Sequence, residues 1–343
     1  MYLAIIGKNE SMCWQKYNLQ KFSRTLAVIA LLSSNLFICA QRALTAEEEN
    51  NFRKCWQEQH SDVEYSNSQS LRFYRIKTEN GSRASLLVLD LNDRSYLLKP
   101  FFNDHPNTVS GVVKEQKALV GINGGFFNLS NGESTSYIVI QGKDQCDPKT
   151  NKALINNPEL APYLETIFNR SEFRIMADKD GKLKASIMSH TDPIPSGWTL
   201  VHSLQAGPRL LPKVTDAEEA FVRKSIDGKL FDSIGSHKKA ARTAIGITRD
   251  NHILLLAVAD KKQDSFSSGV TLEELAKMMR ELGCNQALNC DGGTSTTMII
   301  SAGDSRDELN CTFHKEISGE PEKLVKSGLL VQKNIKRTNS RYR

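Results

Sequence analysis

Gly283 to Ile300, with the sequence GCNQALNCDGGTSTTMII, decides the local fold. An apolar run ends at Asp291, two glycines and a string of hydroxyl side chains follow, and a second apolar run begins at Met298. A carboxylate at a strand end, beside glycines that let backbone approach a ligand, is a common way to build an active site. Because Asp-Gly-Gly is also an ordinary hairpin turn, this stretch alone leaves both interpretations open.

The segment in front of this stretch carries helix signals. Thr271 and Glu274 form a capping-box pattern, and Gly283 suits the position after a helix C-terminus. The apolar residues between them form one stripe, made of Leu272, Leu275, Ala276, Met279 and Leu282. The sequence therefore predicts the order helix, strand, Asp-Gly-Gly turn, strand.

A second stretch repeats this design. Leu119 to Phe127, LVGINGGFF, is an apolar strand that ends at Asn123 and continues into Gly124 and Gly125. Two strand ends of the form Asx-Gly-Gly in one chain suggest two walls of one cleft.

Two arginines follow in similar settings. Arg209 comes after a Gly-Pro turn in QAGPRLL, residues 205–211. Arg242 enters a strand in ARTAIGITRDNHILLLAVAD, residues 241–260, whose second apolar run ends at Asp260.

Taken in order, these four segments resemble the phosphodiester glycosidase family, and the resemblance covers roughly residues 82–331. The matching pieces are Asn123 to Phe127, Gly207 to Arg209, Arg242 to Gly246, and Leu282 to Met298. One departure concerns the closing strand, which in the family has an Arg-Pro-Val-x-Asn-Ala-Leu pattern. Here it reads KLVKSGL, with Lys323 in place of the arginine and Ser327 in place of the asparagine. If that asparagine helps to bind substrate in relatives, the departure bears on substrate choice or activity here.

The resemblance implies hydrolysis of a sugar joined through its anomeric carbon to a phosphodiester. Water would release a free sugar, such as N-acetylglucosamine, and leave a phosphomonoester. The transition state of glycosidic cleavage gathers positive charge on the sugar ring, which a carboxylate can stabilise. Guanidinium groups match the geometry of phosphate oxygens.

This chemistry leads to an assignment of roles. Asp291 is the predicted carboxylate, Arg242 and Arg209 the predicted phosphate holders, and Asn123 a hydrogen-bonding partner of the sugar or phosphate. The remaining predicted substrate-binding residues supply backbone N–H groups, hydroxyls or a further carboxylate: Gly124, Gly125, Gly292, Gly293, Ser295, Thr296 and Asp260. Structural interpretations stay open for each: a turn-capping Asp, arginines in salt bridges, a turn Asn, and hydroxyls on an exposed edge strand.

Other candidates carry less weight. Glu133 and Asp260 are reserve carboxylates, and His202 and His237 flank the site segments. No CxxC pair or HExxH motif is present, so no zinc site of the usual spacing is predicted, and we expect no cofactor.

Two other functions remain in competition. One is a non-catalytic exported protein that binds glycans or an anionic polymer. The other is an exported phosphodiesterase that cleaves the P–O bond. A nucleotide-binding function is not supported, since neither GxGxxG nor GxxxxGK[ST] appears.

Charge is unevenly distributed along the 343 residues, whose net charge is +6. Residues 1–46 and the tail at 333–343 are basic, so the part between them is net acidic, and no nucleic-acid surface is predicted. Lys16, Lys21 and Arg24 precede the apolar stretch 26–40, which is typical of a signal peptide and short for a membrane span. We therefore expect a secreted or periplasmic protein, with an uncleaved anchor as the alternative.

The expected organisation is a signal peptide at 1–46, an N-terminal extension with the first strand at 47–81, a phosphodiester glycosidase domain at 82–332, and a basic tail at 333–343. Strands are expected at 74–77, 86–91, 137–140, 173–177 and 183–188, and helices at 46–56, 109–118 and 217–223. Residues 143–170 and 226–237 read as loops. The predicted fold class is α+β, a single domain on mixed, largely antiparallel sheet with a few packed helices.

Five cysteines would remain after signal removal: Cys55, Cys146, Cys284, Cys290 and Cys311. Export permits disulfides, but their pairing is not readable from sequence. Side chains alternate along a strand, so Cys290 should point away from a cleft that Asp291 faces. Cys290 is therefore predicted to be buried or bridged and not a nucleophile.

Overall fold

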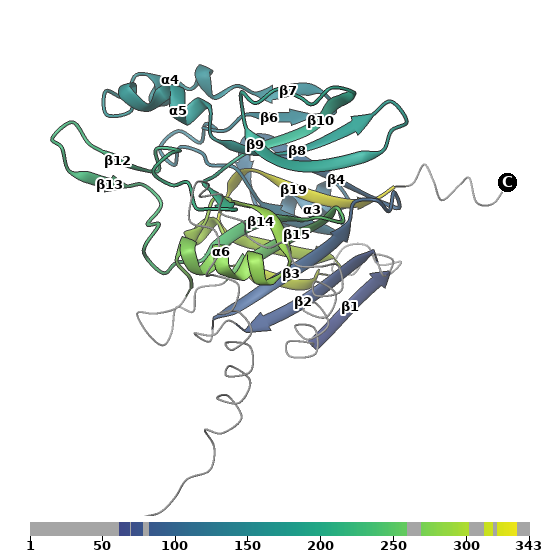
Figure 1. Cartoon of the computed structure of the whole chain (residues 1–343). Helices are drawn as coiled ribbons and strands as arrows, with labels where there is room; N and C mark the ends of the chain where they lie inside the picture. Colours follow the sequence, from purple (N-terminus) through teal and green to yellow (C-terminus); the bar gives the residue numbers. More distant parts are fainter. Residues whose placement is uncertain are drawn as a thin grey trace, which may run out of the picture. The chain divides into compact units, whose positions relative to one another are not determined.

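The computed structural model describes residues 62–68, 70–77, 82–258, 269–301, 312–317 and 321–334. Within them every strand pair is antiparallel, and helices are few (Figure 1). The predicted α+β class is confirmed. Several predictions lie outside the described residues: the signal peptide, the helix at 46–56, most of the basic tail, Asp260, Cys55 and Cys311. None of the helices in these ranges is long and apolar enough to cross a membrane.

The largest sheet has seven strands in the order β1-β2-β3-β15-β14-β16-β11. Its strands are β1 (Asp62–Ser68), β2 (Leu71–Lys77), β3 (Arg83–Asp90), β11 (Arg209–Leu211), β14 (Arg242–Thr248), β15 (His252–Val258) and β16 (Cys284–Asn289). The central strands β14 and β15 are buried along nearly their whole length, which explains their near-continuous apolar sequence.

Two further sheets have five strands each. The first, in the order β18-β17-β5-β19-β4, contains β4 (Tyr96–Asn107), β5 (Val120–Asn123), β17 (Thr297–Ser301), β18 (Thr312–Ile317) and β19 (Val325–Lys333). The second, in the order β7-β6-β10-β8-β9, contains β6 (Ile138–Ile140), β7 (Lys143–Cys146), β8 (Ser171–Asp178), β9 (Leu183–Ser189) and β10 (Trp198–Gln205).

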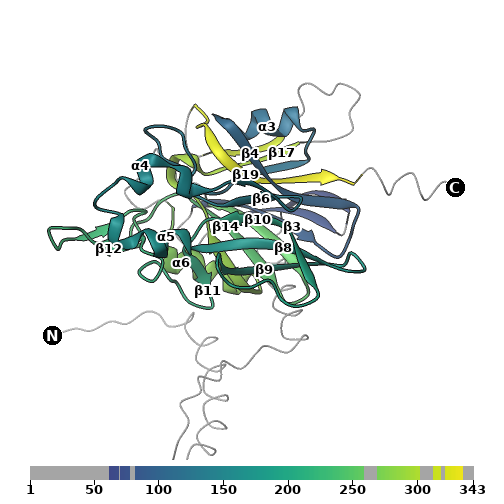
Figure 2. The same ribbon diagram turned by 90° about the horizontal axis from the view of Figure 1, so that it is seen from above.

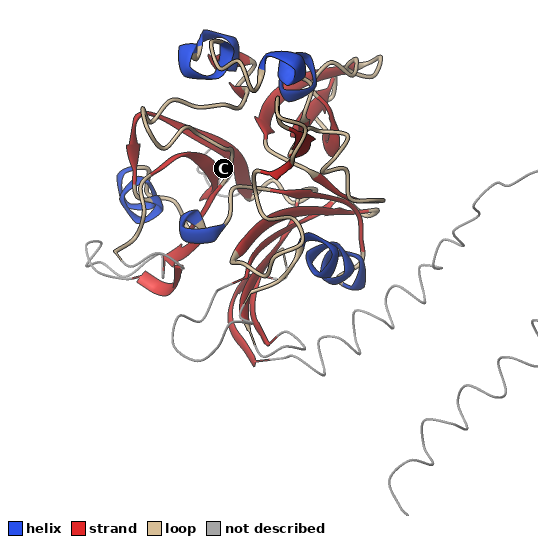
Figure 3. Cartoon of the chain, turned by 90° about the vertical axis from the view of Figure 1, so that its left-hand side faces the viewer, coloured by secondary structure: helices blue, strands red, loops and turns tan. Residues whose placement is uncertain are grey.

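One apolar core joins the three sheets. It takes alternate residues from strands of each, among them Ile245 of β14, Ile122 of β5 and Phe173 of β8. The opposite face of the seven-stranded sheet is covered by α6 (Leu272–Glu281), and α3 (Val109–Glu115) packs on the sheet that contains β5 and β17. Figure 2 shows α3 beside β17, and in Figure 3 the helices lie outside the strands.

Several predicted elements are confirmed. The helix at 109–118 is α3, and the strands at 74–77 and 86–91 belong to the antiparallel pair β2–β3. The helix before the Asp-Gly-Gly stretch is α6, in which Thr271 and Glu274 make both bonds of the capping box. Gly283 follows it with a φ of +82°, a left-handed conformation that favours glycine.

The hairpin interpretation of Asp-Gly-Gly is wrong. β16 lies in the seven-stranded sheet, whereas β17 lies between β5 and β18 in another sheet. A short 3-10 turn, Gly293–Ser295, carries the chain from one sheet to the other. The motif is therefore a crossing between two sheets, as a site loop would be.

Two local predictions are also wrong. The helix expected at 217–223 is a turn, in which Ala220 has a φ of +56°, followed by β12 (Val222–Lys224). The loops expected at 143–170 and 226–237 contain β7, α4 (Lys152–Ile155), α5 (Leu164–Phe168) and β13 (Leu230–Asp232). A small apolar cluster explains the order in this region, because Leu154 and Ile167 pack there with Ala220.

Candidate active site

The two Asx-Gly-Gly motifs meet in the structure. The backbone N–H of Asp291 donates to the carbonyl of Gly124 at 2.8 Å, and the side-chain amide of Asn123 donates to the carbonyl of Asp291 at 2.6 Å. Sequence reasoning placed them on two walls of one cleft. The structure shows that the two motifs are hydrogen-bonded directly to each other.

Asn123 is buried and makes structural bonds. Besides its donation to Asp291, its Oδ1 accepts from the Thr243 hydroxyl at 2.8 Å and from the Thr297 N–H at 3.0 Å. These bonds connect β5, β14 and β17 at one point. A ligand could reach Asn123 only by displacing them, so the structural interpretation is the stronger one for this residue.

Asp291 is a partly exposed residue two positions after the end of β16. Burial raises its pKa to about 6, and hydrogen bonds from the Ser295 hydroxyl and the Gly292 N–H oppose that shift. A carboxyl group with a raised pKa is a candidate for proton transfer near neutral pH. Ser295 and Thr296 are buried, so the edge-strand interpretation of these hydroxyls is wrong.

The N–H groups of the four motif glycines are occupied within the protein. Gly124 and Gly125 donate to the carbonyl and the hydroxyl of Ser327, Gly293 donates to Ala241, and Gly292 donates to Asp291. A Cβ atom at Gly124 would lie 2.6 Å from the Leu204 side chain and 2.8 Å from the Gly328 backbone. Glycine is required here by close packing between sheets, and ligand contact by these N–H groups stays a prediction.

Arg242 is buried, and its guanidinium binds backbone carbonyls of the protein, which does not fit the predicted role of phosphate holder. Its nitrogens donate to the carbonyls of Val270, Ile234, Gly235 and Lys238 at 2.6 to 3.1 Å. The sequence allowed a structural salt bridge as the alternative, and the structure shows a structural role filled by backbone carbonyls instead. Among the described residues no hydrogen bond or ion pair connects Arg242 with the Asp291 carboxylate.

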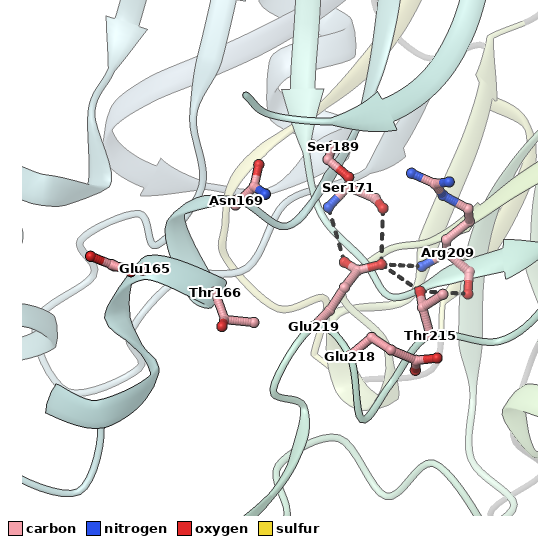
Figure 4. Close-up of a pocket in the computed structure, with 9 residues that line it drawn as sticks. All are labelled: Glu165, Thr166, Asn169, Ser171, Ser189, Arg209, Thr215, Glu218 and Glu219. Atoms are coloured by element: carbon pink, nitrogen blue, oxygen red, sulfur yellow. Dashed lines mark hydrogen bonds between the residues drawn. The ribbon is translucent and has the colours of Figure 1, made fainter. Parts of the chain in front are cut away.

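Arg209 lies elsewhere, in a pocket of about 370 Å³ (Figure 4). Its Nε is buried and has no acceptor among the described residues. In Figure 4 its guanidinium points away from the Glu219 carboxylate. The pocket is otherwise polar, lined by Glu165, Thr166, Asn169, Ser171, Ser189, Thr215, Glu218 and Glu219. A guanidinium with an unused donor, surrounded by hydroxyl and amide groups, is suited to bind a phosphate beside a sugar.

Glu219 organises this pocket, and sequence reasoning missed it. Its buried carboxylate accepts from the N–H and hydroxyl of Ser171, the N–H of Arg209 and the hydroxyl of Thr215, at 2.5 to 2.9 Å. A Cβ atom at Gly207 would lie 2.6 Å from its Oε2, so the glycine of the Gly-Pro turn makes room for it. Arg170 donates to the Glu219 and Ala220 carbonyls and lies over the Phe221 ring.

Asn289 connects the pocket with the Asp291 loop. Its carbonyl accepts from the Gly207 N–H at 2.8 Å, its side-chain amide donates to the Gly207 carbonyl at 2.8 Å, and its N–H donates to the Pro208 carbonyl at 3.0 Å. The turn that presents Arg209 is thus fixed to β16 two residues before Asp291. Asp291 itself does not line the pocket.

A family model for phosphodiester glycosidases matches residues 116–332, which is more than half of the chain. The protein belongs to the phosphodiester glycosidase family. Two solved structures share its fold. The catalytic domain of zebrafish N-acetylglucosamine-1-phosphodiester alpha-N-acetylglucosaminidase, auto-inhibited by its pro-peptide, has a TM-score of 0.53 and 18% identity over 79% of this chain and 86% of its own. A protein from Synechocystis has a TM-score of 0.51 and 15% identity over 77% of this chain and 62% of its own. No curated protein matches the sequence.

The closing strand is where this member of the family departs from the pattern that the sequence resemblance implies, and the structure shows which groups the two changed residues contact. Ser327 is fully buried in β19, where it holds the N–H groups of Gly124 and Gly125. Lys323 is exposed and precedes the strand. Ser327 therefore stabilises the first Asx-Gly-Gly motif by two hydrogen bonds, one to its backbone carbonyl and one to its hydroxyl.

The remaining candidates have other surroundings. Glu133 is exposed in a turn with Asn131, and His237 is exposed. His202 is buried, its Nδ1 accepts from the Gln141 N–H, and burial together with Lys99 lowers its pKa to about 4. Cys290 is a free thiol in the apolar core, which confirms the prediction that it is buried, and burial together with Asp291 raises its pKa. No metal-holding group of three His, Cys, Asp or Glu residues exists in the described ranges.

Proposed function

We propose that this phosphodiester glycosidase hydrolyses a sugar 1-phosphodiester at the bond between the anomeric carbon and the phosphate oxygen. Family membership supports the reaction class. The observation that carries the proposal is the Arg209 pocket, in which a buried Nε has no acceptor in the part of the chain that the structure describes. Export through residues 1–46 is part of the same proposal, since a secreted or envelope enzyme would meet such glycoconjugates.

Arg209 is proposed to hold the substrate phosphate. The Glu219 carboxylate binds the Arg209 backbone N–H and the Thr215 hydroxyl, so the guanidinium extends from a fixed base. Paired donation from a guanidinium to two phosphate oxygens is stronger and more directional than a single contact. It would stabilise the charge that the phosphomonoester gains as the glycosidic bond breaks.

Asp291 is proposed as the carboxylate that acts at the sugar. Water adds to the anomeric carbon, the proton lost by the water passes to Asp291, and the phosphomonoester leaves with the electron pair of the broken C–O bond. A pKa of about 6 keeps Asp291 ionised at neutral pH and able to accept that proton. Because Asp291 does not line the pocket, this role requires the sugar to extend from Arg209 past Asn289 toward the end of β16.

Arg242 has no part in this proposal as a phosphate holder, because its guanidinium is engaged by four backbone carbonyls. Arg209 is then the one remaining candidate for holding the phosphate. A site with one such arginine also fits a second candidate function, a non-catalytic protein that binds a sugar phosphodiester or a glycopolymer. Binding without product release would identify that function.

The test uses the full chain and a panel of sugar 1-phosphodiesters, beginning with an N-acetylglucosamine 1-phosphodiester. We expect free sugar to appear, and we expect Arg209→Ala to lower kcat/KM by about 100-fold while leaving the thermal midpoint near that of the wild type. Calorimetric binding of the panel without turnover by a folded wild type would support the binding function. Neither turnover nor binding would refute both.

A further inference from the structure

The hairpin of β12 and β13 is a two-stranded sheet separate from the three larger sheets. Among the described strands, β12 and β13 pair only with each other, Val222 opposite Asp232 and Lys224 opposite Leu230. In Figures 1 and 2 the hairpin projects outside the large sheets. It is held near its turn, where the Tyr163 hydroxyl donates to the Lys224 carbonyl at 2.8 Å and the Ile226 N–H donates to the Glu159 carboxylate at 3.0 Å.

Large apolar side chains cover the end of this hairpin. Ile226 is 69% exposed, Leu230 72% and Phe231 48%. The described residues contain seven exposed large hydrophobic side chains, and these three lie within six positions of one another on a single hairpin. None of them belongs to an apolar core cluster. Exposed apolar residues that gather in this way mark an interaction surface more often than isolated ones do.

Basic side chains surround the apolar ones. The Arg223 guanidinium lies 4.5 Å from the centre of the Phe231 ring, Lys224 is exposed, and the Lys229 side chain is 82% exposed. Of the two acidic residues on the hairpin, Asp227 pairs with Lys229 at 2.8 Å. Asp232 is turned toward the protein, where its carboxylate accepts from the Ser236 N–H at 2.7 Å. From outside the hairpin, the Glu159 carboxylate accepts from the Ile226 N–H at 3.0 Å. Arg223, Lys224 and Lys229 therefore exceed Asp227 and Glu159 by one positive charge.

We propose that this hairpin docks the protein on an anionic lipid bilayer, with Ile226, Leu230 and Phe231 entering the headgroup and acyl boundary. Apolar side chains beside lysine and arginine are the combination that binds such an interface. A protein partner fits less well, since three side chains on a projecting hairpin fall far short of the roughly 800 Å² that each side of a stable protein interface buries.

The proposal does not rest on the hydrolytic activity, although the two are spatially related. Glu219, which organises the Arg209 pocket, stands three residues before the start of β12, and Arg170 binds its carbonyl and lies over the Phe221 ring beside it. A docked hairpin would hold the pocket close to the membrane surface, where a sugar phosphodiester with a lipid aglycone would be presented.

The test replaces Phe231 by tryptophan in the full chain and measures fluorescence on vesicles of phosphatidylcholine and phosphatidylglycerol whose acyl chains carry bromine. The three native tryptophans give the wild-type baseline. We expect the added Phe231→Trp signal to shift to the blue and to be quenched. Leu129→Trp, at a side chain 86% exposed outside the hairpin, is the matched control and should not be quenched. If the apolar stretch 26–40 alone bound the vesicles, the protein would sediment with them while Phe231→Trp stayed unquenched, and the proposal would be refuted.

The apolar and the charged side chains are tested separately. In the Phe231→Trp chain, the added changes Ile226→Ser and Leu230→Ser should reduce the quenched fraction of the added fluorescence by about tenfold or more. The double variant Lys224→Glu with Lys229→Glu should remove the dependence on phosphatidylglycerol. Release of sugar from a small soluble substrate should be unchanged in both. Equal binding of all variants to neutral and anionic vesicles would contradict the docking role.

Discussion

The Nδ2 of Asn123 donates to the carbonyl of Asp291 at 2.6 Å, and this bond joins the two Asx-Gly-Gly motifs across 168 positions of sequence. The same side chain accepts from Thr243 and Thr297, so one buried amide ties three strands from two sheets. The loop that carries Asp291 is therefore fixed on its Asn123 side, as the role proposed for Asp291 requires.

Asn123→Ala should destabilise the fold by about 2–4 kcal/mol. The change leaves the Thr297 N–H and the Asp291 carbonyl without a partner in a buried place, and the cost of an unsatisfied buried group exceeds the value of the bond itself. Urea unfolding measures the effect. Asn131→Ala, in an exposed turn, is the control and should change stability by less than about 0.5 kcal/mol. A small effect at Asn123 with a large loss of activity would favour a direct ligand role.

Arg242→Ala should cost about 3–5 kcal/mol of folding free energy, because four backbone carbonyls lose a charged donor. Arg209→Ala should cost much less, since its guanidinium Nε has no protein acceptor in the described chain. Denaturant midpoints of the two variants make the comparison. If Arg242→Ala folded normally and only raised KM, Arg242 would be a phosphate holder after all.

Glu219→Gln should disrupt the pocket although it keeps the side-chain shape. The carboxylate accepts four hydrogen bonds, whereas the amide nitrogen of glutamine replaces one oxygen and turns its own N–H groups toward the N–H of either Ser171 or Arg209. We expect a loss of about 2–3 kcal/mol and a raised KM. Glu218→Gln, at a side chain 53% exposed and paired with Lys213, is the neighbouring control. Equal behaviour of the two variants would remove the organising role of Glu219.

Asp291→Asn should separate stability from activity. The folded-state pKa of about 6 lies above the ordinary 3.8, so the native state favours the protonated acid. The ionised carboxylate therefore destabilises the native state above about pH 6, and this cost fades as pH falls toward 3.8. Asp291→Asn should raise the free energy of unfolding by about 1–3 kcal/mol at pH 7 and change it little at pH 3.5.

Activity should show the opposite pattern at this residue. Wild-type kcat/KM should fall as pH drops through about 6, when Asp291 becomes protonated, and Asp291→Asn should be inactive throughout. A variant that is more stable and still active would show that Asp291 is a turn residue only.

The sequence predicted the regular elements best where local chemistry and burial agree. The capping box at Thr271 and the stripe of α6 specify a helix without help from the rest of the chain. The residues of the two motifs could be found as well, because an Asx-Gly-Gly strand end is unusual when it occurs twice. Their direct contact could not, since it depends on which strands pair, and β5 pairs with the strand that follows the second motif.

Glu219 and Arg242 show why roles are harder to read than positions. Ala217 to Arg223 has good helix formers, but the inward turn of Glu219 toward four donors outweighs that local preference. Arg242 begins a buried strand, and the carbonyls that hold it come from a loop and from Val270, which is 28 positions away. Neither set of contacts can be predicted from the spacing of residues in the sequence.

The decisive measurement is hydrolysis of an N-acetylglucosamine 1-phosphodiester, or of the sugar 1-phosphodiester that the panel identifies, by the full chain in water enriched in ¹⁸O. We predict that the label enters the free sugar, which means C–O cleavage, and that Arg209→Ala slows its appearance by about 100-fold. Label in the phosphate would show P–O cleavage by a phosphodiesterase. Absence of product from every sugar phosphodiester, with a folded protein, would contradict the hydrolytic function.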